Sequence, residues 1–156
     1  MFELDIPGFG PIKLEHFVSD FTGTLSVDGK LLPGVKEGLS LIAKLLRVHV
    51  LTADTFGKAR AELKGVTCEM HILEGAALDR QKEEFVHKLG TEGVIALGNG
   101  NNDRRMLKAA KIGIAVCLDE GCSSDALISS DIFVKSPVDA FDLLLYPKRL
   151  TATLRY

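Results

Sequence analysis

Tryptophan, tyrosine and cysteine are scarce in this sequence, and long hydrophobic runs are missing. Its 156 residues include 0 Trp, 2 Tyr and 3 Cys. The cysteines are odd in number and lack the spacing of zinc ligands, so we interpret them as small apolar residues in a reducing cytoplasm: Cys68, Cys117 and Cys122. The most apolar stretch, residues 39–50, contains two basic side chains, so we expect no membrane-spanning helix.

Charge of one sign is not in excess either. Lys and Arg total 19, Asp and Glu total 21, and the formal net charge is -2. This balance offers no basic surface for nucleic acid and no polybasic patch for a membrane, so we expect neither as a partner. The first ten residues also lack the basic start and apolar stretch of a signal peptide. We therefore expect a cytoplasmic globular protein.

Hydrophobic periodicity predicts one α/β domain over residues 1–156, with a hairpin at 1–15, a core at 16–145 and a helical tail at 146–156. Strands and helices alternate with short connections, which predicts a three-layer, Rossmann-like, doubly wound parallel sheet. The predicted strands end at residue 20 and cover 48–51, 71–73, 94–97, 112–116 and 132–134. The predicted helices cover 35–46, 57–64, 79–89 and 103–110, and a last helix starts near 138.

The N-terminal hairpin has two interpretations. Alternating apolar residues flank a Pro- and Gly-rich turn at 7–11, which is typical of paired strands. We favour a hairpin that packs on its own core at the edge of the sheet. A flap over a site, or a contact between subunits of a homo-oligomer, is the alternative.

The segment S-D-F-T-G-T-L, residues 19–25, places Asp20 at the tip of an apolar strand. A Gly-containing turn follows, so one carboxylate lies next to several backbone N–H groups. Such groups can bind a phosphate while the carboxylate attacks it. Alternatively, Asp20 only caps a turn.

A second polar segment, L-G-N-G-N-N-D, residues 97–103, also follows an apolar strand. Taken alone it fits a helix cap. In a parallel sheet, however, functional groups gather at the carboxyl ends of strands, so Asn99 and Asp103 are expected to face Asp20. Oxygen ligands at this point suit Mg²⁺, which would let a phosphate dianion approach a carboxylate.

These motifs resemble those of the haloacid-dehalogenase (HAD) superfamily. D-F-T-G-T-L is similar to the D-K-T-G-T-L phosphorylation signature of P-type ATPases, and G-N-G-N-N-D is similar to their G-D-G-x-N-D motif. Thr52-Ala53-Asp54 stands in the place of T-G-D, and Lys82 in Q-K-E-E-F-V fits the lysine motif. The resemblance runs from about residue 14 to about 145 and implies a HAD-like fold, of the uncapped P-type-ATPase-like group.

The resemblance also implies roles for individual residues. Asp20 would attack phosphorus and become an aspartyl phosphate, Thr52 would hold the phosphoryl group, and Lys82 would neutralise charge between them. Lys88 is the alternative lysine if the helix register differs. Phosphate binding is further implied for four residues: Phe21, Gly23, Ala53 and Asn102. Mg²⁺ is implied as the cofactor, held by Asp20, the carbonyl of Thr22, and Asn99 or Asp103.

Two positions depart from the family pattern. Asn99 replaces an Asp that usually binds the metal directly, so we expect weaker Mg²⁺ binding. Thr22 replaces the second Asp that phosphatases use as general acid and base, a group worth about 10²–10⁴ in rate. We therefore expect slow turnover, a preference for good leaving groups and a long-lived phosphoenzyme.

The intervals from Asp20 to Thr52 and from Thr52 to Lys82 are each too short for a cap or nucleotide-binding domain of about 50 residues. Together with the lack of a membrane-spanning segment, this leads us to expect that the chain is not an ion pump and that its site is open. The function that we favour is a phosphatase or phosphoanhydride hydrolase acting on a phosphorylated small molecule or phosphoprotein. A module that senses a phosphorylated ligand or binds a partner protein is the alternative, and a regulatory domain phosphorylated in trans on Asp20 is a third.

Overall fold

The computed structural model describes residues 1–53 and 57–156. At its centre are six parallel strands in the order β10-β9-β8-β3-β6-β7. This arrangement confirms the predicted doubly wound sheet. The strands are β3 (His16–Asp20), β6 (Arg47–Thr52), β7 (Glu69–Ile72), β8 (Val94–Gly98), β9 (Ile112–Val116) and β10 (Ile132–Val134).

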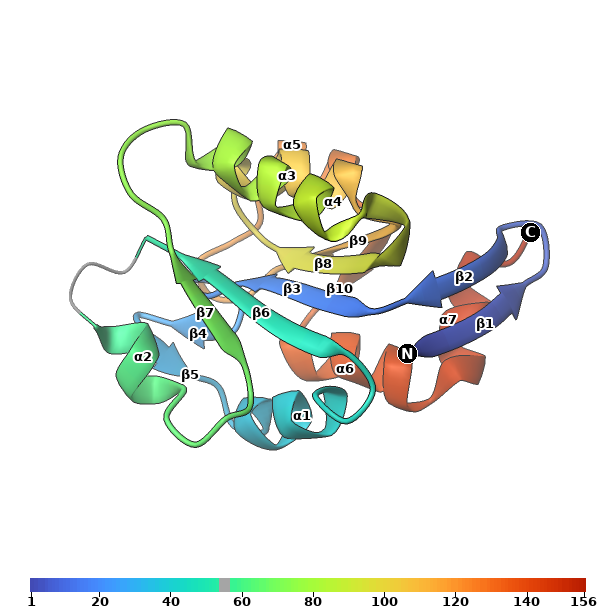
Figure 1. The fold of residues 1–156 in the computed structure, drawn as a ribbon, viewed down its shortest axis with the longest axis horizontal. Coiled ribbons are helices and arrows are strands. Elements are labelled where there is room, and N and C mark those ends of the chain that lie inside the picture. The colour runs from blue at the N-terminus through green and yellow to red at the C-terminus, as the bar shows by residue number, and fades with distance from the viewer. Residues whose placement is uncertain (54–56) are drawn as a thin grey trace.

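Helices cover both faces of the sheet and complete three layers (Figure 1). One face carries α3 (Leu78–Leu89), α4 (Arg104–Ala109) and α5 (Ser124–Ser129). The other carries α1 (Val35–Ile42), α6 (Pro137–Leu145) and α7 (Pro147–Leu154). A short helix, α2 (Lys58–Glu62), lies beside a two-stranded hairpin made of β4 (Ser26–Val27) and β5 (Lys30–Leu31).

Successive side chains of a strand point to opposite faces of the sheet. Because helices cover both faces, the side chains of the central strands are buried on either side. Every residue of β3, β8 and β9 is buried. Phe17 joins the core under α1 and α6, where its ring packs edge-on against Phe141 at 5.8 Å. Val18 joins the core under α3 and α4. This double burial fixes β3 in the sheet, and Asp20 at its carboxyl end is fixed with it.

The N-terminal hairpin, β1 (Phe2–Ile6) paired with β2 (Gly10–Leu14), forms a separate two-stranded sheet. It buries four hydrophobic side chains in the main core, as the favoured interpretation requires: Phe2, Ile6, Ile12 and Leu14. The hairpin precedes the amino end of β3 and so lies at the opposite end of the sheet from Asp20 (Figure 1). The alternative interpretation of the hairpin as a flap over the site is therefore wrong.

Some element boundaries differ from the predictions, and two short strands and one short α-helix were not predicted: β4, β5 and α5. The helix predicted over 35–46 ends at Ile42, and turns carry the chain on so that Leu46 still reaches the core before β6. The sequence pattern did not reveal α5, a helix of 6 residues that the Ser123 hydroxyl caps. Pro147 at the start of α7 separates that helix from α6.

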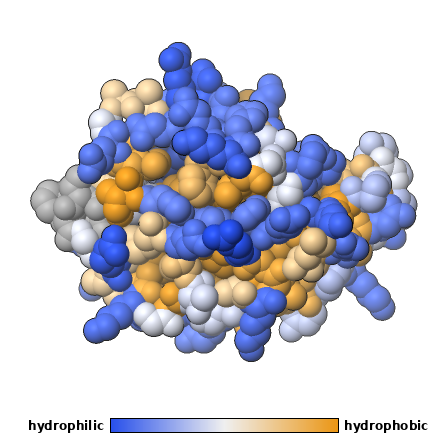
Figure 2. All heavy atoms as spheres, viewed as in Figure 1, coloured by the Kyte–Doolittle hydropathy of each residue, from blue (hydrophilic) through white to orange (hydrophobic). Residues whose placement is uncertain are grey.

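No cap-sized insertion occurs in the described part of the chain between Asp20 and Lys82, which forms only β4, β5, α1, β6, α2, β7 and the start of α3. None of the described helices has the length and hydrophobicity needed to cross a membrane. On the face shown in Figure 2, hydrophilic side chains predominate and hydrophobic atoms are exposed in strips between them.

Candidate active site

A cavity of 520 Å³ opens at the carboxyl ends of β3, β6 and β8. It brings together most of the predicted site residues, which come from four separate segments of the chain. Those on its wall are Asp20, Phe21, Thr22, Thr52, Ala53, Lys82, Asn99 and Asn102. Five residues that were not predicted also line it: Gly29, Lys58, Leu78, Gly100 and Asn101.

Lys82 forms the centre of the polar network. Its side chain is buried, and Nζ lies 2.9 Å from Oδ1 of Asp20 and 2.7 Å from Oδ1 of Asp103. Nζ also donates to the Asn102 side-chain oxygen at 3.2 Å. Lys88, the alternative lysine, is exposed on the outer side of α3. The helix register therefore places Lys82 in the site.

Burial and neighbouring charges together raise the pKa values of both Asp20 and Lys82. Burial raises the pKa of Asp20 to about 6, and the nearby Asp103 carboxylate adds to the rise, although Lys82 and Thr24 oppose it. Burial alone would lower the pKa of Lys82, but Asp20 and Asp103 hold it above its usual value. Lys82 is therefore charged at neutral pH.

Asp103 does not lie on the cavity wall and is fully buried behind it. Its Oδ2 accepts hydrogen bonds from the backbone N–H groups of Asn99 and Gly100, each at 3.0 Å. Its Oδ1 faces Lys82. In this arrangement Asp103 holds both the lysine and the loop that carries Asn99.

Thr24, which was predicted only as a turn residue, belongs to the site. Its hydroxyl lies 3.0 Å from Oδ2 of Asp20 and 3.0 Å from Oδ1 of Asn99, and its single proton can serve one of them at a time. The Asn99 amide donates to the Gly121 carbonyl at 3.1 Å, which fixes the direction of its oxygen. A hydroxyl four residues after Asp20 was the signal that the sequence offered.

Gly23, which was predicted to bind substrate, is not among the residues that line the cavity and lies against Asn99. Its φ is 76°, a conformation that favours glycine, and a Cβ at this position would lie 2.6 Å from Nδ2 of Asn99. Thr52, at the end of β6, is buried, and Ala53 is exposed. Asp54, the third residue of the T-A-D segment, lies outside the described residues.

The donor set suits a hard divalent cation. Asp20 supplies a carboxylate, Thr22 a backbone carbonyl and Asn99 an amide oxygen, all on the cavity wall. Two buried carboxylates face one buried ammonium in the Lys82 network, so one negative charge is left without a partner inside it. A Mg²⁺ ion held by Asp20, Thr22 and Asn99 would offset that charge and leave one positive charge for an anionic ligand.

No protein-family model matches the sequence, but individual relatives and solved structures do. Uncharacterized protein MJ0073 of Methanocaldococcus jannaschii is 51% identical over 73 residues, which are 47% of this chain and 78% of that protein. The probable copper-transporting ATPase HMA5 of Arabidopsis thaliana is 31% identical over 115 residues, which are 72% of this chain but 11% of the ATPase.

Among solved structures, a Moraxella catarrhalis 3-deoxy-D-manno-octulosonate 8-phosphate phosphatase, in complex with magnesium and phosphate ions, matches with a TM-score of 0.65 and 18% identity. The match covers 91% of this chain and 94% of that one. A zinc-transporting PIB-type ATPase matches with a TM-score of 0.62 and 25% identity, over 78% of this chain and 20% of the ATPase.

The chain has the fold of haloacid-dehalogenase (HAD) hydrolases. It is also related to P-type ATPases, as its sequence motifs suggest. The small share of each ATPase that the match covers means that this HAD-like chain corresponds to one part of those pumps. Divalent metal ions, magnesium or cobalt, are present in the solved HAD phosphatases that it resembles.

Proposed function

We propose that this chain is a Mg²⁺-dependent phosphohydrolase that forms an aspartyl phosphate on Asp20. The observation that carries the proposal is the position of Asp20, whose carboxylate lines an open cavity while Lys82 and Thr24 hold its two oxygens. A carboxylate held in this way points at one place and cannot rotate freely, which suits nucleophilic attack.

The proposed reaction has two steps. In the first, an Asp20 carboxylate oxygen bonds to phosphorus and the bond from phosphorus to the leaving group breaks. In the second, water attacks phosphorus, inorganic phosphate leaves and the Asp20 carboxylate is restored. Lys82 carries positive charge beside the reacting oxygens. The backbone N–H groups of Phe21 and Thr22 would face the phosphoryl oxygens, because those of residues 23–26 are hydrogen-bonded within the turn. Bound Mg²⁺ would supply further charge neutralisation.

Thr22 limits the proposed rate. It stands on the cavity wall where a general acid would protonate the leaving group, and threonine cannot do so. The proposed good substrates are therefore aryl and acyl phosphates, whose leaving groups depart without protonation. The physiological substrate is proposed to be a phosphorylated small molecule or a phosphoprotein, and the absence of a cap among the described residues leaves room for either.

Cytoplasmic location is part of the proposal, and three free cysteines without a disulfide support it. Binding to nucleic acid or to a membrane is not proposed, because the charges are balanced. A homo-oligomer is compatible with the proposal, and a second subunit could then contribute to substrate selectivity.

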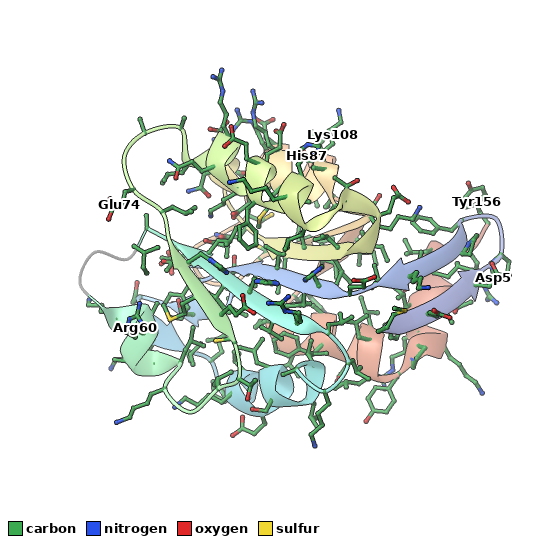
Figure 3. The ribbon with its side chains drawn as sticks, in the orientation of Figure 1. Asp5, Arg60, Glu74, His87, Lys108 and Tyr156 are labelled. Atoms are coloured by element: carbon green, nitrogen blue, oxygen red, sulfur yellow. The ribbon has the colours of Figure 1, made fainter. Side chains whose placement is uncertain are left out.

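The test is Mg²⁺-dependent release of p-nitrophenol from p-nitrophenyl phosphate. The wild type is expected to turn over slowly and Asp20→Asn not at all. Asp5→Asn is the matched control, because Asp5 is exposed on the hairpin at the far end of the molecule (Figure 3). Equal activity of the wild type and Asp20→Asn would overturn the nucleophile assignment.

The second candidate is a module that binds a phosphorylated ligand without turning it over, and Asn99 is the observation in its favour because a neutral ligand weakens the metal site. An inactive wild type that binds Mg²⁺ and phosphate would support this candidate. Trapping of the acyl phosphate with hydroxylamine, after incubation with acetyl phosphate or ATP, would instead support a domain that is phosphorylated in trans.

A further inference from the structure

Three histidines stand in a row across neighbouring strands, away from the candidate active site. His16 lies on β3, His49 on β6 and His71 on β7, all on the face that α3 covers. Nδ1 of His16 is 3.1 Å from Nε2 of His49, and Nδ1 of His49 is 3.3 Å from Nε2 of His71. The strand pairing places Glu69 of β7 directly opposite His49.

Three potential ligand atoms converge at the outer end of this row. Oε2 of Glu69 is 3.5 Å from Nδ1 of His49 and 3.9 Å from Nε2 of His71. With the 3.3 Å separation of the two nitrogens, the point equidistant from all three atoms lies about 2.1 Å from each, the length of a zinc–nitrogen or zinc–oxygen bond. We propose that His49, Glu69 and His71 bind Zn²⁺ or a chemically similar divalent transition metal.

The ligands are held by further residues, as in protein metal sites generally. His49 uses its other ring nitrogen, Nε2, for the contact with His16, so an Nε2–H group can donate to His16 and leave Nδ1 free for a metal. Arg47 pairs with Oε1 of Glu69, which leaves Oε2 directed at the two histidines. His16 and Arg47 are thus positioning residues.

The site is closed on its inner side and open on its outer side. The His49 side chain is 2% exposed, whereas those of His71 and Glu69 are 32% and 47% exposed. Phe85 of α3 packs against both rings, with centroid distances of 5.3 Å to His49 and 4.5 Å to His71. An ion can therefore enter from solvent, and water can complete a four-coordinate site.

This site is separate from the proposed Mg²⁺ site. His49, Glu69 and His71 are not among the residues that line the cavity around Asp20. The strand register places His71 level with Asp20 but two strands away, which is a lateral separation of about 10 Å. Two imidazoles and one carboxylate suit zinc, nickel, cobalt or copper, whereas the all-oxygen set around Asp20 suits magnesium. The inference does not rest on the proposed phosphohydrolase function.

A metal at this position would join the edge strand β7 to β6. Strand β7 pairs with a neighbour on one side only, and its side chains are partly exposed. If the metal binds the folded chain and not the unfolded chain, the free energy of unfolding rises with the logarithm of the metal concentration. The assigned role is therefore stabilisation of the sheet edge by the metal.

The test is a calorimetric titration of chelator-treated protein with Zn²⁺. Every variant also carries Asp20→Asn and is titrated with excess Mg²⁺ present, so that the all-oxygen site around Asp20 does not compete for Zn²⁺. One equivalent of Zn²⁺ is expected to bind, and His71→Ala and Glu69→Gln are expected to weaken binding by at least about tenfold. His87→Ala is the matched control, because His87 lies on the outer side of α3 (Figure 3).

Three more measurements keep the test decisive. Circular dichroism of each variant checks that it is folded, and the imidazole nitrogen resonances of His49 Nδ1 and His71 Nε2 are expected to shift on Zn²⁺ addition. The unfolding temperature is expected to rise with Zn²⁺ in the wild type but not in His71→Ala. Absence of Zn²⁺ binding, equal binding by His71→Ala, or loss of binding only in Cys68→Ala would overturn the assignment.

Discussion

Gly98 and Asp103 are in such close contact that no side chain fits between them. A Cβ atom on Gly98 would lie 2.6 Å from both Cβ and Cγ of Asp103. Gly98 is the last residue of β8, and its φ is not in the left-handed region, so close approach rather than backbone conformation requires glycine. The contact determines how near Asp103, and with it Lys82, can come to the sheet.

Gly98→Ala is expected to displace Asp103 and to lower both stability and activity. Overpacking of this kind costs about 1–3 kcal/mol. Urea denaturation measures the stability, and p-nitrophenyl phosphate hydrolysis measures the activity. Gly100→Ala is the matched control, since a Cβ there would have its nearest neighbour at 3.7 Å. If the two variants behaved alike, the contact would not be the cause.

Lys82→Met is expected to destabilise the protein more than any exposed lysine substitution. It leaves Asp20 and Asp103 buried beside one another without a cation, and removal of one partner of a buried ion pair costs about 3–5 kcal/mol. Chemical denaturation measures the loss. The double variant Lys82→Met/Asp103→Asn should recover part of it, and Lys88→Met should lose almost none.

The metal-free protein is expected to lose stability as the pH rises through about 6. The pKa of Asp20 is raised to about 6 in the fold, so the folded chain binds a proton that the unfolded chain has already released above its ordinary value near 3.8. The Asp20 contribution is present below that ordinary value and is lost by pH 7, at most about 3 kcal/mol.

Urea denaturation in chelator at several pH values tests this expectation, with the difference between the wild type and Asp20→Asn as the measured quantity. Asp20→Asn should lack this component of the pH dependence. Parallel pH curves for the two proteins would contradict the raised pKa.

Asn99→Asp is expected to bind Mg²⁺ more tightly, by about tenfold or more, because it adds a negatively charged ligand. Without metal the same variant should be less stable, since a third carboxylate joins Asp20 and Asp103 and the amide donor to the Gly121 carbonyl is lost. Calorimetry with Mg²⁺ and beryllium fluoride measures the affinity. Unchanged affinity would mean that Asn99 does not contact the metal.

Thr22→Asp is expected to speed hydrolysis of alkyl phosphates more than that of p-nitrophenyl phosphate. Thr22 is exposed on the cavity wall, and an Asp at this position could protonate a poor leaving group. A well-placed general acid contributes about 10²–10⁴ in rate, so even a poorly aligned one should be measurable. The ratio of the two rates is the quantity to compare, and an equal gain on both substrates would argue against acid catalysis.

The sheet and the main site residues were predictable because their signals are local. Apolar strands that end in polar segments placed Asp20 and Asn99 at the same edge of a parallel sheet, and the family motifs supplied Lys82. The helix α5 was missed because 6 residues hold less than two turns of periodicity. The flap interpretation was wrong because periodicity predicts a hairpin but not the end of the sheet on which it lies.

Contacts that depend on strand pairing could not be predicted. Glu69 and His71 are two residues apart, so a strand places them on one face, but only the register between β6 and β7 brings His49 opposite Glu69. Likewise, the role of Gly98 depends on the packing of Asp103, which comes from the next helical turn of the chain. Such relationships require the folded structure.

A backbone hydrogen bond joins the last residue of this chain to the hairpin turn: the Tyr156 N–H donates to the Pro7 carbonyl at 3.1 Å. The Met1 amino group donates to the Leu45 carbonyl, just before the amino end of β6. Both ends of this chain therefore lie away from the carboxyl ends of the strands, where the cavity opens. A fluorescent label, an affinity tag or a sensor surface attached at either end would leave the cavity mouth unobstructed for large phosphorylated ligands.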